Sequence, residues 1–264
     1  MAGVPKILML PGYTQNAAIF SGRLGAIRRG IKDSAELVFV DPPHIVDTPT
    51  NSSADFDSSA SSNPASAEDT PRAWWFAEAK EGWRHFNKMD ESLVYLRDIL
   101  EKQGPFDGVW GFSQGAAAAA MLTALVENPS LNPIFAAPSS DPAVVWPPAP
   151  FKFSILSAGF MPADPVWKAL FDTPVKTPTL HVLGRGDTIV GSDRSLPLVD
   201  AFVDARVEWH DGGHHTPSKA SWRNFFKAYL DLFKEGGVGA SGIAEIPSPA
   251  GAVAGPEDGA SGKL

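Results

Sequence analysis

Three polar residues that are far apart in the chain, Ser113, Asp187 and His214, could together perform acyl transfer. A serine hydroxyl is a poor nucleophile at neutral pH, so it needs an imidazole to accept its proton and a carboxylate to orient that imidazole. The chain order serine, aspartate, histidine is one in which such triads occur. We therefore predict Ser113 as nucleophile, His214 as base and Asp187 as orienting acid.

Ser113 lies at the centre of Gly111-Phe112-Ser113-Gln114-Gly115, the pattern of a nucleophile elbow. A strand that turns directly into a helix strains its corner residue, and only small neighbours fit beside it. Residues 106–110 before the motif favour a strand, and the alanine-rich stretch 116–121 after it favours a helix. The alternative is a serine that merely closes a tight turn.

Three histidines near the end of the last predicted strand compete for the role of base. His210 belongs to that strand, whereas Gly212-Gly213 forms a flexible turn that can carry His214 over the sheet edge. His215 is the next residue and should point elsewhere. The sequence favours His214 and leaves His215 and His210 as alternatives.

The orienting acid has alternatives as well. Asp187 lies just past the end of a predicted strand at residues 179–183, so it should lie at the sheet edge where ligands bind in α/β folds. It could instead be a solvated loop residue, with Asp211 or Asp200 in the role.

Apolar runs and helical periodicity alternate along the chain, which predicts an α/β fold with helices on both faces of a mostly parallel sheet of about six strands. We predict strands at residues 6–10, 37–41, 106–110, 151–157, 179–183 and 206–210. Phe20, Leu24, Ile27 and Ile31 make one apolar stripe on a helix that Asn16 can cap. Further helices are predicted at residues 90–103, after the elbow, within 192–203 and around 222–233.

Residues 1–235 are predicted to form one domain. Within it, the polar stretch 48–71 should be a mobile surface loop, and the proline-rich stretch 132–150 a loop or cap. Residues 236–264 contain mostly Gly, Ala, Pro and Ser, and we expect a disordered tail.

Composition narrows the class of protein. The 264 residues carry a net charge of −8, which disfavours nucleic acid or an anionic membrane as partner. With no cysteine, disulfides, thiolate metal sites and a cysteine nucleophile are all excluded. No signal peptide or membrane span is evident, so we expect a soluble cytoplasmic protein.

Aromatic residues return abruptly after the polar stretch, at Trp74, Trp75 and Phe76 with Trp83 and Phe86 beyond. These rings could pack over the sheet edge, or some could line an acyl-binding cleft. Phe160 and Met161 follow a predicted strand and should lie at its carboxyl end, where a substrate could reach them.

Several segments together resemble the FSH family of serine hydrolases, which includes fungal esterases and the ovarian-cancer-associated esterase, over residues 6–235. The segments are Leu10-Pro11-Gly12-Tyr13-Thr14-Gln15-Asn16, Arg72-Ala73-Trp74-Trp75, Gly104-Pro105-Phe106-Asp107-Gly108, Gly111-Phe112-Ser113-Gln114-Gly115, Leu180-His181-Val182-Leu183-Gly184 with Asp187, and Gly213-His214. The resemblance implies an α/β-hydrolase fold with Ser113, Asp187 and His214 as triad, and hydrolysis of carboxylic esters or acyl thioesters. The family usually has histidine where this chain has Pro11.

The expected oxyanion hole consists of the backbone N–H groups of Tyr13 and Gln114, and no metal or organic cofactor is needed. The substrate would be a small acyl ester or thioester, or an acyl chain on a carrier protein, as in fungal relatives that release a polyketide from a synthase in trans. A peptidase and a catalytically silent binding protein of the same fold are the alternatives.

Overall fold

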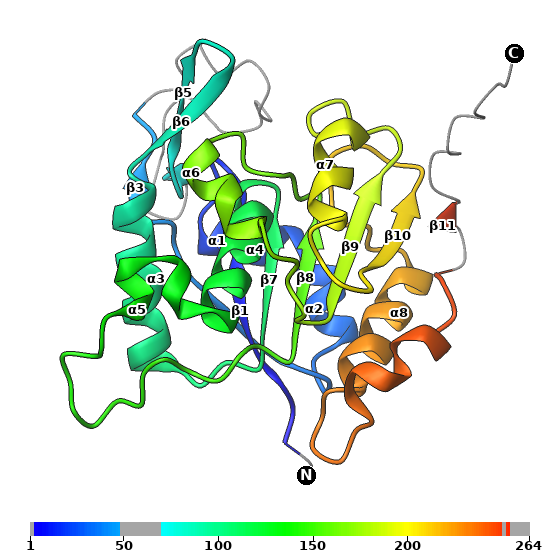
Figure 1. The fold of residues 1–264 in the computed structure, drawn as a ribbon. Helices are drawn as coiled ribbons and strands as arrows, with labels where there is room; N and C mark the ends of the chain where they lie inside the picture. The colour runs from blue at the N-terminus through cyan, green and yellow to red at the C-terminus, as the bar shows by residue number, and fades with distance from the viewer. Residues whose placement is uncertain (1–2, 48–69, 250–251, 254–264) are drawn as a thin grey trace, which may run out of the picture.

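The computed structural model describes residues 3–47, 70–249 and 252–253, and its centre is a seven-stranded sheet in the order β11-β10-β9-β8-β7-β1-β2 (Figure 1). The strands are β1 (Lys6–Leu10), β2 (Glu36–Phe39), β7 (Gly108–Phe112), β8 (Phe153–Ser157), β9 (Thr179–Gly184), β10 (Arg206–His210) and β11 (Ala252–Val253). β11 is antiparallel to β10, and every other pairing in the sheet is parallel. The predicted fold class is confirmed.

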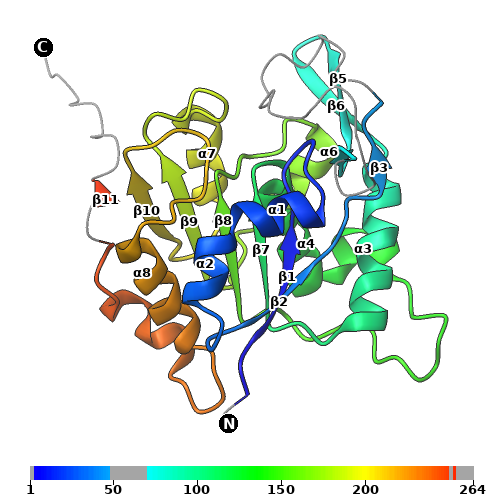
Figure 2. The same ribbon diagram turned by 180° about the vertical axis from the view of Figure 1, so that it is seen from behind.

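Helices cover both faces of this sheet. One face carries α1 (Ala17–Arg23), α2 (Gly25–Gly30) and α8 (Ala220–Asp231), as Figure 2 shows. The other carries α3 (Met89–Gln103), α4 (Gln114–Glu127), α7 (Ser192–Val199) and the short helices α5 (Pro133–Ala136) and α6 (Pro165–Lys168). In the described ranges, no helix has the length and apolar character that crossing a bilayer requires.

The side chains of β1 show why the sheet is buried on both faces. Successive side chains of a strand point to opposite sides. Accordingly Ile7 and Met9 pack in the core with α1, α2 and α8, whereas Leu8 and Leu10 pack in the core with α3 and α4. A strand covered on both faces must be apolar throughout, which explains the continuous run that predicted it.

The predicted stripe of α1 and α2 is confirmed, because its four apolar residues are all buried. The Asn16 side chain accepts a hydrogen bond of 2.8 Å from the Ile19 N–H, which satisfies a donor at the start of α1. Two helices, separated at Leu24, take the place of the single predicted one.

Two small sheets lie outside the main one and were not predicted. β3 (His44–Ile45) pairs with β4 (Arg72–Ala73), and β5 (Phe76–Lys80) pairs with β6 (Trp83–Asn87). Gly82, with φ of +78°, makes the β5–β6 turn possible. The hairpin is fixed at its base, where the buried Asp164 carboxylate accepts a 2.8 Å hydrogen bond from the Phe86 N–H.

The structure bears differently on the predictions for the polar stretch 48–71 and for the proline-rich stretch 132–150. Most of the predicted loop 48–71 lies outside the described residues. The stretch 132–150 begins with α5, which follows the 3-10 helix η3 (Pro129–Leu131), and has no further helix or strand. It lies at the lower end of the molecule in Figure 1, where the parallel strands begin, so it is a loop and does not cap their carboxyl ends.

The expected disorder of the carboxyl-terminal segment is wrong for residues 236–249. These include the 3-10 helix η5 (Gly239–Glu245), and Ile246 is buried in the core that α8 covers. The Arg206 guanidinium donates to the carbonyls of Ile243 and Ile246, at 2.7 and 2.8 Å. A segment with few apolar residues is thus ordered through its backbone carbonyls, which composition does not reveal.

Candidate active site

Ser113 occupies the tight turn between β7 and α4, and its side chain is almost fully buried. Its φ of 53° and ψ of −117° lie outside the regions that L-residues prefer, as expected of a strained elbow. A Cβ on Gly111 would lie 2.1 Å from the Gly115 carbonyl oxygen. The two glycines of the motif are therefore required by the close approach of strand and helix.

Ser113, His214 and Asp187 form a continuous hydrogen-bonded chain. His214 Nε2 lies 2.8 Å from Ser113 Oγ, and His214 Nδ1 lies 2.7 Å from Asp187 Oδ2. The residues come from the elbow, from the turn after β10 and from the turn after β9, which all lie at the carboxyl end of the sheet. Phe112 packs against the imidazole, with ring centroids 4.9 Å apart.

The alternative histidines and aspartates lie elsewhere. His210 and His215 contact each other, with ring centroids 4.7 Å apart, and His210 Nδ1 accepts a hydrogen bond from the Gly212 N–H. Asp211 and Asp200 are exposed. The structure thus brings together the three residues that the sequence favoured.

Asp187 is oriented by the backbone that follows it. Its Oδ1 atom accepts hydrogen bonds from the Ile189 and Val190 N–H groups at 2.9 and 2.8 Å, which leaves Oδ2 for His214. Burial raises the pKa of this carboxyl, but the hydrogen bonds from His214 and from the two backbone N–H groups outweigh it, so the pKa lies below its ordinary value. These two donors were not predicted from the sequence, although aspartate in a turn commonly accepts such bonds.

The turns that carry Asp187 and His214 contact each other directly. The Gly186 N–H donates to the Gly212 carbonyl at 3.1 Å. A Cβ on Gly184 would lie 2.5 Å from the Gly213 carbonyl oxygen, so only glycine fits there. This contact holds the turns of Asp187 and His214 against each other.

The loop that contains Tyr13 packs against the elbow. A Cβ on Gly115 would lie 2.1 Å from the Leu10 carbonyl oxygen and 2.3 Å from that of Pro11. The Gly12 N–H is occupied, because it donates to Gln15 Oε1 at 3.3 Å. Tyr13 is half-buried, and Gln114 is the first residue of α4.

The predicted substrate contacts require correction. Trp74, Trp75 and Phe160 are all buried in the core on the α3 and α4 side of the sheet, so none of the three presents a surface to a substrate in this structure. Trp75 stacks on Phe86 of the β5–β6 hairpin with ring centroids 4.7 Å apart, and its edge contacts Phe160. Met161 is only partly buried, and its contact with a substrate stays a prediction.

Ionisable side chains in the described ranges do not gather into a metal site. No group of three or more His, Asp or Glu side chains there is arranged to hold a metal ion.

Comparisons with known proteins show which proteins this chain is similar to. A family model described as "Serine hydrolase (FSH1)" matches residues 1–226. Esterase OVCA2 of Danio rerio is 35% identical over 245 residues, which cover 89% of this chain and 100% of the relative. Esterase OVCA2 of Homo sapiens is 33% identical over 238 residues, which cover 87% of this chain and 97% of the relative.

Solved structures share the fold. Zea mays acyl-protein thioesterase 2 superimposes with a TM-score of 0.53 at 17% identity, over 87% of this chain and 95% of that one. At this identity the similarity concerns the arrangement of strands and helices, which is that of an α/β hydrolase.

Proposed function

Because the chain belongs to the FSH1 family of serine hydrolases, we propose that it hydrolyses carboxylic esters or acyl thioesters through an acyl-enzyme on Ser113. The observation that carries the proposal is the chain of two hydrogen bonds, 2.8 and 2.7 Å long, from Ser113 through His214 to Asp187.

Acylation follows from this geometry. Ser113 Oγ attacks the carbonyl carbon of the substrate while its proton passes to His214 Nε2. The Asp187 carboxylate holds the Nδ1–H side of the ring and stabilises the imidazolium that forms. The imidazolium then gives its proton to the leaving alcohol or thiol, and the carbonyl reforms as an ester of Ser113.

Deacylation repeats the sequence with water. His214 removes a proton from a water molecule, whose oxygen attacks the acyl carbon, and Ser113 Oγ leaves with the returned proton. In both halves the carbonyl oxygen becomes negative. We assign its stabilisation to the backbone N–H groups of Tyr13 and Gln114, aided by the position of Gln114 at the start of α4.

The substrate class is a small acyl ester or thioester, free or bound to a carrier protein. The names of the relatives, esterases, support an oxygen ester, and the thioesterase with the same fold makes a thioester worth testing. A series of p-nitrophenyl esters and acyl-CoA thioesters of increasing chain length would separate the two. Faster hydrolysis of amides than of either would favour a peptidase.

The proposal is tested with Ser113→Ala. We expect turnover to fall by about three or more powers of ten and labelling by a fluorophosphonate to disappear, while the melting temperature changes little. Esterase activity within about tenfold of the parent would overturn the assignment of Ser113. A parent protein that neither turns over esters nor reacts with the fluorophosphonate would indicate a binding protein with the same fold.

A further inference from the structure

Trp74 connects the two segments from which the oxyanion donors are expected. Its indole Nε1–H donates to the Pro11 carbonyl at 2.9 Å, and its backbone N–H donates to Gln114 Oε1 at 2.9 Å. The residue is fully buried, so these hydrogen bonds are shielded from water.

The Gln114 side chain completes this connection. Its Nε2 donates to the Trp75 carbonyl at 2.9 Å, so both ends of the amide are bonded to the backbone of consecutive tryptophans. The side chain is buried, and it belongs to the residue whose backbone N–H is assigned to the oxyanion hole. The first turn of α4 is therefore tied to residues 74 and 75.

The indole of Trp74 holds the Pro11 carbonyl in place through its hydrogen bond. That oxygen lies against Gly115, where a Cβ would be 2.3 Å away, so it has no freedom to move toward α4. Tyr13, the second assigned donor, follows Pro11 by two residues. A misplacement of about 1 Å in a catalytic group can cost about a hundredfold in rate, so the indole contact bears on catalysis.

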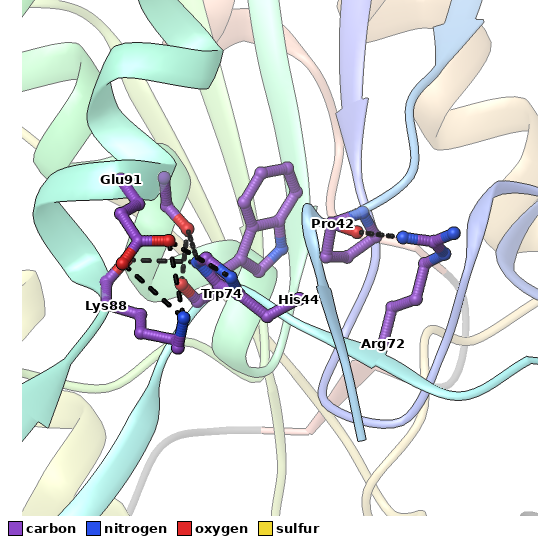
Figure 3. A network of polar contacts seen from close by, with 7 residues as sticks. Pro42, His44, Arg72, Trp74, Lys88 and Glu91 are labelled. Atoms are coloured by element: carbon purple, nitrogen blue, oxygen red, sulfur yellow. Dashed lines mark hydrogen bonds and ion pairs between the residues drawn. The ribbon is translucent and has the colours of Figure 1, made fainter. Parts of the chain in front are cut away.

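Trp74 is itself held in place by residues of β3 and α3. The Ser92 hydroxyl donates to the Trp74 carbonyl, and His44 Nε2 lies 3.1 Å from both Ser92 Oγ and the Lys88 carbonyl. Figure 3 shows the polar contacts that join His44, Lys88 and Glu91 next to Trp74. All three polar groups of Trp74, its N–H, C=O and indole N–H, are therefore bonded within the protein.

We propose that Trp74 is a positioning residue that holds the backbone N–H groups of Tyr13 and Gln114 at the spacing an oxyanion needs. It acts through Pro11 and the Gln114 side chain and does not touch the substrate. The inference rests on the proposed function, because it assigns a role in stabilising the tetrahedral intermediate.

The test compares Trp74→Phe with Trp146→Phe. Each substitution removes an indole N–H that donates to a backbone carbonyl, since Trp146 donates to Phe135 at 2.8 Å. Trp146 belongs to the stretch 132–150, which Figure 1 shows at the end of the sheet opposite to the active site, so it serves as the matched control. The readouts are kcat and KM on a p-nitrophenyl ester, and the Ki of a trifluoromethyl ketone, whose adduct with Ser113 carries an oxyanion.

We expect Trp74→Phe to lower kcat by about 10- to 100-fold with KM within about twofold, less than the loss of a whole oxyanion donor. The Ki of the ketone should rise by the same factor as kcat falls. The pH profile should keep its shape, because Ser113, His214 and Asp187 are untouched. Trp146→Phe should stay within about twofold of the parent in both constants.

The inference is overturned if Trp74→Phe has a kcat within about twofold of the parent, or if only its KM rises. It is also overturned if Trp146→Phe loses as much kcat as Trp74→Phe does. If Trp74→Phe does not fold, Gln114→Met replaces it in the test. This substitution removes the side-chain amide that bonds to residues 74 and 75 but keeps the backbone N–H of residue 114. The same changes in kcat, KM and Ki are expected, and the same results would overturn the inference. An active parent with an unaffected Trp74→Phe overturns this inference alone. A parent without Ser113-dependent activity overturns the proposed function and this inference together.

Discussion

His214 Nε2 lies 2.8 Å from Ser113 Oγ, although 101 positions separate the two residues in the chain. The contact exists because β7 and β10 end at the same edge of the sheet and each is followed by a turn that points its side chain over that edge. The neighbouring His215 faces His210 instead. Adjacent residues of one turn thus have unlike environments.

This difference predicts unlike effects for two single substitutions. His214→Ala should lower the rate of Ser113 acylation by about three or more powers of ten, because His214 is the base that contacts the hydroxyl. His215→Ala should cost about tenfold or less. Stopped-flow measurement of acylation with a p-nitrophenyl ester checks both. If His215→Ala is inactive and His214→Ala has normal activity, the catalytic base has been assigned one residue too early in the turn.

Gly115 is predicted to be irreplaceable by alanine. The new Cβ would lie 2.1 Å from the Leu10 carbonyl oxygen and 2.3 Å from that of Pro11, so the backbone of this segment leaves it no room. We expect Gly115→Ala to lower the free energy of unfolding by about 1–3 kcal/mol and to reduce kcat as the Pro11 loop moves. Urea denaturation and steady-state kinetics measure the two effects.

Gly22→Ala is the matched control for that substitution. A Cβ on Gly22, an exposed residue of α1, would meet nothing within 4 Å. Alanine favours a helix over glycine, so the variant should be more stable than the parent by about 0.5–1 kcal/mol with unchanged kcat. Equal behaviour of the two variants would contradict the steric explanation.

The parts of the molecule that the sequence predicted are those that local patterns determine. The continuous apolar run of β1 and the stripe through Phe20 and Ile27 reflect burial directly. The small residues around Ser113 reflect a local steric requirement. Alternation of strand and helix then places the strand ends, and with them the triad residues, at one edge.

The parts that the sequence did not predict depend on contacts between distant segments. Nothing local to Trp74 indicates that its indole bonds to Pro11, so the positioning role proposed for it could not be predicted from the sequence. The same holds for residues 236–249, whose order depends on the Arg206 guanidinium in β10.

Truncation tests the packing of the carboxyl-terminal segment. Removing residues 236–264 should lower the free energy of unfolding by about 2–4 kcal/mol, because it uncovers the core beside Ile246 and leaves Arg206 without two acceptors. Thermal melting monitored by circular dichroism would measure the loss. Truncation after Val253 keeps these contacts and is the control. If the protein without residues 236–264 has the same melting temperature as the parent, the segment does not pack against the domain in solution.

The last prediction concerns His181, a residue of β9 that the site does not use. It is fully buried, and neither ring nitrogen has a hydrogen-bond partner within the described structure. Burial lowers the pKa of this histidine from 6.5 to about 3. The ring therefore stays neutral in the folded protein at every pH at which the protein is expected to work.

The sign of the pH effect follows from the unfolded chain. Below pH 6.5 the unfolded state binds a proton at His181 that the folded state rejects down to pH about 3. Stability is therefore fully present above pH 6.5 and is lost as the pH falls through this window, by at most about 1.4 kcal/mol per pH unit.

Replacing His181 by leucine should remove this loss. At pH 7.5 we expect a gain of about 1 kcal/mol, because two unpartnered nitrogen atoms leave the core. Between pH 7.5 and 5 the difference in unfolding free energy between variant and parent should grow by about 2 kcal/mol, since His210 and all other titrating groups are common to both proteins. Urea denaturation at the two pH values measures it. A difference that stays constant with pH would show that His181 is protonated equally in the folded and unfolded chains.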